Sequence, residues 1–77
     1  MPKIKKLSVK DYMADKWDIE DVKATMARLG GGDSKEFTMG WLTAHALLDS
    51  NYIEITDTLH YAKEIANGVR EWVNERF

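Results

Sequence analysis

The chain has 77 residues, a formal net charge of -2 and no cysteine, and these facts exclude several classes of protein. A chain of this length forms one domain that buries only about 60% of the surface of its unfolded state. Without cysteine it has no disulfide, no thiolate metal site and no catalytic thiol. The longest apolar stretch is too short to span a bilayer and the N-terminus lacks the apolar region of a signal peptide, so we expect a cytosolic protein without a membrane segment.

Positive charge is concentrated at the N-terminus. The first ten residues hold four lysines (Lys3, Lys5, Lys6 and Lys10) and no acidic residue, which leaves the remaining 67 residues with a net charge of about -6. We therefore predict a basic tail, residues 1–7, followed by a single helical domain, residues 8–77.

Two helix starts follow the tail, and each carries a capping signal. Ser8 with Asp11 three residues later predicts a helix over 8–16, and Asp18 with Asp21 predicts a second helix over 18–29. At both starts an apolar residue precedes the cap and another lies four positions after it, which is the pattern of a hydrophobic staple. Three glycines at 30–32 end the second helix, because glycine adopts the positive φ of a helix C-cap.

The third predicted helix begins near Asp33 or Ser34 and runs to about Asn51. Its residues 37–48 carry no formal charge, in a chain where 31% of residues are charged. Such a helix is apolar over far more than the usual third of its circumference, so either the fold or a partner must cover it on most sides. Gly40 lies in its interior, where glycine costs roughly 1 kcal/mol relative to alanine, and this indicates close approach of another helix or a bend.

The last predicted helix begins around Thr56 to Thr58 and continues to the end, after an alternating segment, 52–55, that is typical of a short strand. The Asn67-Gly68 pair is a turn signal, but the apolar period stays in phase across it, so we predict one helix. One apolar stripe of this helix is able to pair with a second copy of the chain, although packing on the chain's own core is the more common use of such a stripe. The stripe contains Leu59, Ala62, Ala66, Val69 and Val73.

Together these elements predict an all-α fold, a small four-helix domain whose third helix is the most buried. The only extended element is expected at 52–55. The predicted core consists of Tyr12, Val22, Met26, Leu29, Trp41, Leu42, Leu48, Ile55, Leu59, Ile65, Val69 and Val73.

The residues offer little catalytic chemistry. His45 and Asp49, four positions apart, and His60 on another helix are residue types that bind metals, but the HExxH pattern and cysteine are both absent. A histidine on an apolar face is more often a core residue, so we expect no metal and no cofactor. A serine nucleophile needs a base and an oxyanion site, and no GxSxG elbow is present, so we expect no enzymatic activity.

One short segment resembles a known family. Leu29-Gly30-Gly31-Gly32-Asp33-Ser34, about six residues of the chain, is similar to the serine loop of acyl carrier proteins. The resemblance implies that Ser34 carries a phosphopantetheine arm. Those proteins place an apolar residue after the serine and an acidic helix beyond it, whereas this chain has Lys35 and an uncharged helix.

A second resemblance covers more of the chain. Two short helices, a glycine turn, a longer helix and an extended segment follow the order of a winged helix-turn-helix domain, with a degenerate wing at 52–56. This order makes a DNA-binding transcriptional regulator the alternative function. The third helix would then be the recognition helix, yet residues 37–50 contain no Arg, Lys, Asn or Gln to contact bases. Contacts to phosphate would have to come from Lys3, Lys5, Lys6, Lys10 and Lys35.

The preferred interpretation is a small non-enzymatic regulator or inhibitor that binds a larger protein and also itself. Three tryptophans, three tyrosines and four methionines supply the aromatic and thioether contacts that interfaces favour. The candidate anchors are Trp17, Trp41, Trp72 and Tyr52. Because so small a core cannot easily enclose three tryptophans, we expect at least one to be more than half exposed.

Overall fold

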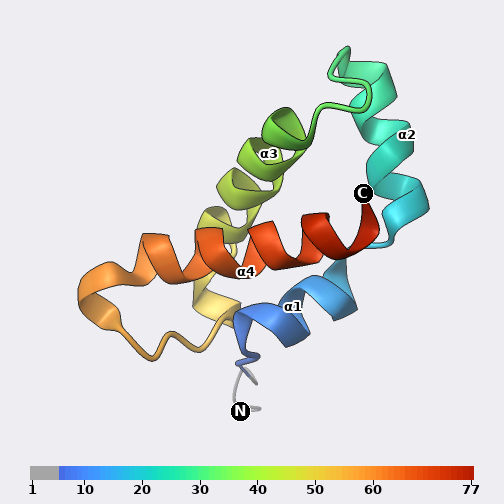
Figure 1. Cartoon of the computed structure of the whole chain (residues 1–77). Coiled ribbons are helices and arrows are strands. Elements are labelled where there is room, and N and C mark those ends of the chain that lie inside the picture. The colour runs from blue at the N-terminus through green and yellow to red at the C-terminus, as the bar shows by residue number, and fades with distance from the viewer. Residues whose placement is uncertain (1–5) are drawn as a thin grey trace.

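The computed structural model describes residues 6–77, and these residues form an all-α domain, as the sequence predicts (Figure 1). Its four α-helices are α1 (Val9–Lys16), α2 (Ile19–Leu29), α3 (Lys35–Leu48) and α4 (Tyr61–Arg76). Short 3-10 helices cover Ser50–Tyr52 and Thr58–His60. The described residues contain no helix that is both long enough and apolar enough to cross a membrane.

Local capping explains where the first three helices begin. The side chains of Ser8, Asp18 and Ser34 accept hydrogen bonds from the backbone N–H three residues later, at 3.1, 3.4 and 3.2 Å. Helix α2 ends at Leu29, and its C-cap Gly30 has a φ of 85°. The Gly30 N–H donates to the Ala27 carbonyl at 3.3 Å, and the N–H groups of Gly31 and Gly32 donate to the Met26 carbonyl at 2.9 and 3.3 Å. The predicted starts of these helices and the predicted end of α2 are confirmed.

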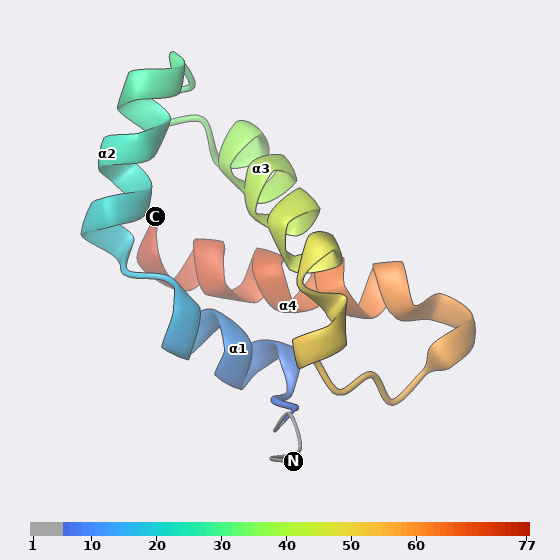
Figure 2. The ribbon, with the colours of Figure 1, turned by 180° about the vertical axis from the view of Figure 1, so that it is seen from behind.

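Helix α4 is the element on which the domain is assembled. It packs against both α1 and α3, and α2 lies at the end of the molecule where α3 begins (Figures 1 and 2). Since α1 and α2 are separated by only Trp17 and Asp18, the chain turns sharply between them. This arrangement leaves one side of α3 without a neighbouring helix.

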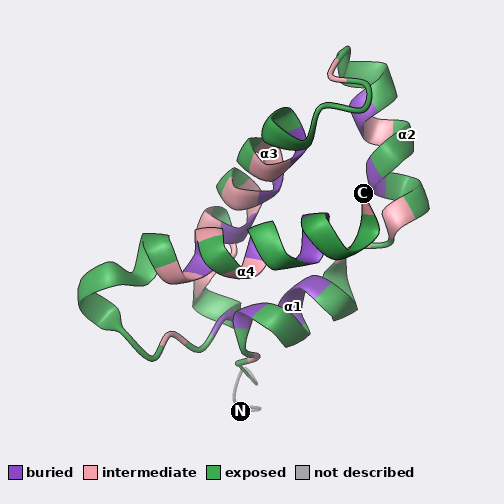
Figure 3. Cartoon of the chain, viewed as in Figure 1, coloured by how far each residue is buried: buried purple, intermediate pink, exposed green. Residues whose placement is uncertain are grey.

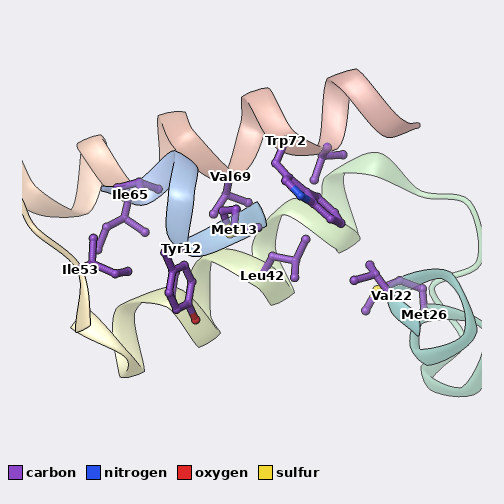
Figure 4. Close-up of a cluster of buried hydrophobic side chains, with 12 residues drawn as sticks. Tyr12, Met13, Val22, Met26, Leu42, Ile53, Ile65, Val69 and Trp72 are labelled. Carbon is purple, nitrogen blue, oxygen red and sulfur yellow. The ribbon is translucent and has the colours of Figure 1, made fainter. Parts of the chain in front are cut away.

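The core runs along α4, from Ile53 and Ile65 at one end to Val22 and Met26 of α2 at the other (Figure 4). Seven of the twelve predicted core residues are buried: Tyr12, Val22, Met26, Leu42, Ile65, Val69 and Val73. Trp41 and Ile55 are only partly buried. The prediction is wrong for Leu29, Leu48 and Leu59, which are 52%, 80% and 87% exposed. The other five buried hydrophobic residues, which the sequence did not predict as core, are Val9, Met13, Ala46, Ile53 and Trp72.

These errors share one physical cause. Leu29 is the last residue of α2, Leu48 is the last residue of α3, and Leu59 lies in the 3-10 turn before α4. At a helix end the apolar period continues in the sequence, but the neighbouring helix has already diverged. Each of these leucines therefore fits the apolar spacing of the sequence but has no neighbouring helix to pack against.

Gly68 lies within an unbroken α4, so the prediction of one helix across Asn67-Gly68 is confirmed. A Cβ atom at Gly68 would stand 2.2 Å from Cγ1 of Val9. Glycine is therefore needed here because α1 approaches the backbone of α4 closely, and it does not mark a turn.

The segment after α3 differs from a wing. Ile53 forms an isolated parallel bridge with Leu7, in which Leu7 donates to the Tyr52 carbonyl at 2.9 Å and Glu54 donates to the Leu7 carbonyl at 2.7 Å. Between residues 6 and 77 no strand pair is present that would form a wing at 52–56. The extended segment instead holds the start of α1 against the end of α3.

Helix α4 begins later than the sequence indicates. The Glu64 carboxylate accepts hydrogen bonds from the backbone N–H groups of Thr56 and Asp57 and from the Thr56 hydroxyl, at 2.9–3.2 Å. These contacts stabilise the ionised form and lower the pKa of Glu64. Glu64 thus holds residues 56 and 57 as a loop, and regular α-helix starts at Tyr61.

Candidate protein-binding surface

Helix α3 has one covered face and one uncovered face. Thr38, Leu42 and Ala46, spaced by four residues, are fully buried and mark the side that packs on the rest of the domain. The Thr38 hydroxyl donates to the Ser34 carbonyl at 2.8 Å, so this buried polar group is satisfied. Figure 3 shows the buried positions of α3 on its inner side and exposed positions on the side turned away from α4.

The uncovered side of α3, which we call the outward face, consists of Phe37, Gly40, Ala44 and Leu48. All four are exposed, Phe37 to 42% and Leu48 to 80%. A Cβ atom at Gly40 would meet nothing within 4 Å, so no part of the domain approaches the helix there. Within the described chain, the close approach that Gly40 suggested is therefore absent. The outward face carries no charge between Phe37 and Leu48.

Beside the outward face lies a cluster of three rings, Trp17, Trp41 and His45. Trp17 and Trp41 meet edge to face with centroids 5.4 Å apart, and His45 lies 4.1 Å from Trp41 and 5.7 Å from Trp17. Edge-to-face contacts of this kind add about 0.5–1.5 kcal/mol to the burial of the rings. Because Trp17 follows α1 directly, the cluster joins the end of α1 to the middle of α3.

Asp49 connects the end of α3 to α1. Its carboxylate accepts a hydrogen bond from the Tyr12 hydroxyl at 2.5 Å and lies 3.6 Å from the Lys16 ammonium. Burial, together with the neighbouring Asp49 carboxylate, raises the pKa of Tyr12 above its ordinary range. Both contacts fix the orientation of α3, and through it the direction in which the outward face points.

The structure places the predicted anchor residues in three different environments. Trp17 and Trp41 are partly buried in the ring cluster, whereas Trp72 is a core residue, 4% exposed, with the Arg76 guanidinium 4.6 Å from its ring centre. The expectation that one tryptophan is more than half exposed is therefore wrong. Two rings share one cluster, and the core along α4 accommodates the third. Tyr52 is 51% exposed in the 3-10 turn after α3.

The predicted self-association stripe of α4 is divided between core and surface. Val69 and Val73 are fully buried within the chain, Ala66 is partly buried, and Ala62 and Leu59 are exposed. A second copy cannot contact Val69 or Val73 while this fold is intact. The stripe is thus corrected to an intramolecular contact over its C-terminal part, because α1 and α3 both pack there.

The lysines proposed for DNA contact do not gather on α3. Lys6 and Lys10 are exposed near the start of α1, while Lys35 is exposed at the first turn of α3, and Figure 1 places these two helix starts at opposite ends of the molecule. Lys3 and Lys5 lie outside the described residues. The described lysines therefore do not form one continuous positive surface with the uncharged helix.

The remaining candidate chemistry is also separated in space. Ser34 is exposed and caps α3 through its hydroxyl oxygen. His60 contacts Asp57 at 3.0 Å and not His45 or Asp49. Among residues 6–77, no group of three or more His, Asp or Glu side chains is placed to hold a metal ion.

The sequence indicated that this helix is uncharged, but it did not indicate which side of the helix is exposed. The fold and this surface together define a small four-helix domain with one uncovered, uncharged helix face. Comparisons with protein-family models, curated proteins and solved structures found no significant match to the chain.

Proposed function

We propose that this protein is a small non-enzymatic module that binds another protein chain through the outward face of α3. The observation that supports the proposal is the exposure of Phe37 and Leu48 on a helix without a formal charge from residue 37 to residue 48. The domain buries or partly covers the other residues between 37 and 48, so the outward face is the one stripe of this uncharged segment that it leaves exposed. Contact with another protein would cover the outward face.

The size of the gain can be estimated from the two large side chains. Burying a whole Leu or Phe side chain contributes about 1.5–3 kcal/mol. With Leu48 80% exposed and Phe37 42% exposed, covering them would contribute about 2 and about 1 kcal/mol. Gly40 and Ala44 add little area, but they let the partner backbone come close.

The biological role that we propose is regulation or inhibition of a larger protein. The small size and the presence of one exposed apolar face suit a chain that acts by occupying a surface of another protein. A partner helix or groove without charge would match the outward face best.

The proposal is tested by capture from a nuclease-treated lysate of the source organism, using the tagged full chain. Ala44→Glu places a charge in the middle of the outward face. Ala24→Glu places the same charge on an exposed alanine of α2 and is the matched control. We expect proteins that are retained by the wild type and the control and reduced at least about tenfold by Ala44→Glu, since each 1.4 kcal/mol lost is a factor of ten. A captured set that is identical for all three chains would overturn the proposal.

A further inference from the structure

We propose that α2 is a lid: it leaves the rest of the domain as a unit while α1, α3 and α4 stay together, and the Phe37 ring is the catch that holds it closed. Opening uncovers Val22, Met26 and the end of the core beside Trp72, an apolar surface that the closed domain hides (Figure 4). The support comes from the contacts that hold α2, from the links at its two ends and from the position of Phe37.

Helix α2 has the smallest attachment of the four helices. Among residues 6–77, no hydrogen bond or ion pair joins it to α1, α3 or α4. Only two of its side chains, Val22 and Met26, are buried, whereas α4 buries four. The Lys23 ammonium also lies 5.6 Å from the centre of the Phe77 ring, but Lys23 is exposed and such a contact is weak in water. Because hydrophobic attraction scales with buried area, α2 is the helix that separates most easily.

The links at both ends of α2 allow it to swing. Trp17 is held in the ring cluster, so the pivot at the start of α2 is Asp18, which is exposed and has extended backbone angles. At the other end the chain passes through three glycines, of which Gly30 and Gly32 have positive φ values of 85° and 57°. The hydrogen bonds that cap α2 all lie within residues 18–32. Separation of α2 from the core therefore breaks none of them.

The turn between α2 and α3 is held by one aromatic ring. A Cβ atom at Gly31 would stand 2.7 Å from Cε1 and 2.8 Å from Cγ of Phe37, so the ring lies directly on the backbone of Gly31. The N–H of the same glycine donates to the Met26 carbonyl at 2.9 Å. The ring therefore contacts the turn at the point where the chain leaves α2. Because the rest of the Phe37 ring belongs to the outward face, a protein bound there would contact the catch.

Thiol labelling of the full chain measures the opening, because the sequence has no cysteine of its own. Val22→Cys and Val69→Cys are the same substitution at two equally buried sites, one in α2 and one in α4. Denaturation of each variant gives the labelling rate that global unfolding alone would allow. We expect the thiol of Val22→Cys to react at least about tenfold faster than that rate, and the thiol of Val69→Cys to match it.

The catch is tested by removing the Phe37 ring in the Val22→Cys chain. Phe37→Ala frees the turn and should raise the labelling rate about tenfold. Leu48→Ala is the matched control, because it removes a large apolar side chain from the far end of the same helix, and it should leave the rate unchanged. Circular dichroism verifies that each variant is folded.

Hydrogen exchange provides a second measurement that needs no cysteine. A separated helix of 11 residues is marginally stable in water, so the amides of residues 22–29 should exchange at least about tenfold faster than those of residues 65–73 in the wild type. Equal exchange of the two segments, or a Val22→Cys thiol that reacts no faster than global unfolding allows, would overturn the lid. Equal effects of Phe37→Ala and Leu48→Ala would overturn the catch. None of these measurements involves a partner, so the lid and the proposed function can fail independently.

Discussion

Replacing Gly68 with alanine should destabilise the domain, although alanine is the better helix former. The added Cβ would lie 2.2 Å from Cγ1 and 2.8 Å from Cβ of Val9, whereas carbon atoms in contact normally stay about 3.5–4.0 Å apart. Overpacking of this kind costs about 1–3 kcal/mol, and the short distance favours the upper end. The higher helix propensity of alanine offsets about 1 kcal/mol of this cost. We expect a net loss of about 1–2 kcal/mol, which lowers Tm by roughly 5–15 °C in a domain of this size.

The matched control is Gly40→Ala, measured at the same low micromolar concentration. Gly40 also lies inside a helix, but open space surrounds its missing Cβ, so alanine should raise the unfolding free energy by about 1 kcal/mol. The two glycine-to-alanine changes therefore have opposite signs. Chemical denaturation followed by circular dichroism at one temperature measures both values.

A double-mutant cycle with Val9→Ala identifies the cause. Val9→Ala alone removes buried methyl groups and should cost about 2 kcal/mol. In that background the 2.2 Å contact is removed while the 2.8 Å contact to Cβ of residue 9 remains, so Gly68→Ala should destabilise the Val9→Ala chain less than it destabilises the wild type. If Gly68→Ala stabilises the wild-type chain, or destabilises both backgrounds equally, the inferred close approach of α1 to α4 is refuted.

Three further predictions concern single contacts and the alternative function. Tyr12→Phe removes the hydrogen bond to Asp49 and should lower the unfolding free energy by about 1.5 kcal/mol, the low end for a charged acceptor because Asp49 keeps some contact with water. Above about pH 10 the unfolded wild-type chain releases the Tyr12 proton and the folded chain retains it, so the wild type loses stability there. Tyr12→Phe should make this loss of stability smaller. Because its folded-state pKa is lowered, Glu64 contributes stability above its ordinary pKa, and that contribution disappears as the pH falls through the lowered value. Glu64→Gln should therefore reduce the acid dependence of Tm, and an unchanged profile would contradict the role of Glu64 in the 56–57 loop. Fluorescence anisotropy with a labelled DNA duplex should detect no binding at about 0.15 M salt; sub-micromolar affinity that is lost when Lys3, Lys5, Lys6 and Lys10 are neutralised would favour the DNA-binding alternative.

The parts of the fold that depend on neighbouring residues were predictable from the sequence. Ser8, Asp18 and Gly30 fix helix boundaries through hydrogen bonds that span only a few residues. No distant residue is needed to form them, so the sequence pattern and the structure agree. The same holds for the continuity of α4 across Gly68, where the apolar period gave the right answer.

The parts that depend on distant residues were predicted less well. Val9 and Ile53 are buried because α1 crosses α4 and because Ile53 bridges to Leu7, and neither contact appears in a local pattern. Glu64 shortens α4 by binding a loop seven or eight residues earlier, a contact that the helical period does not reveal. Trp72 is 4% exposed beside the fully buried Val73, a burial that the apolar stripe of α4 alone does not predict.

Helix α3 shows most clearly where sequence information ends. Its apolar residues cover so much of the circumference that periodicity does not distinguish Leu42 from Leu48, and both were assigned to the core. The fold makes the distinction, because α4 contacts only the side that carries Leu42. Leu48 then remains 80% exposed on a helix that has no charged residue on any side between 37 and 48. Gly40, Ala44 and Leu48 are all exposed, so the packing of the domain does not require apolar residues at these positions. An uncharged face that the rest of the domain leaves exposed is the physical reason to look for a second chain there.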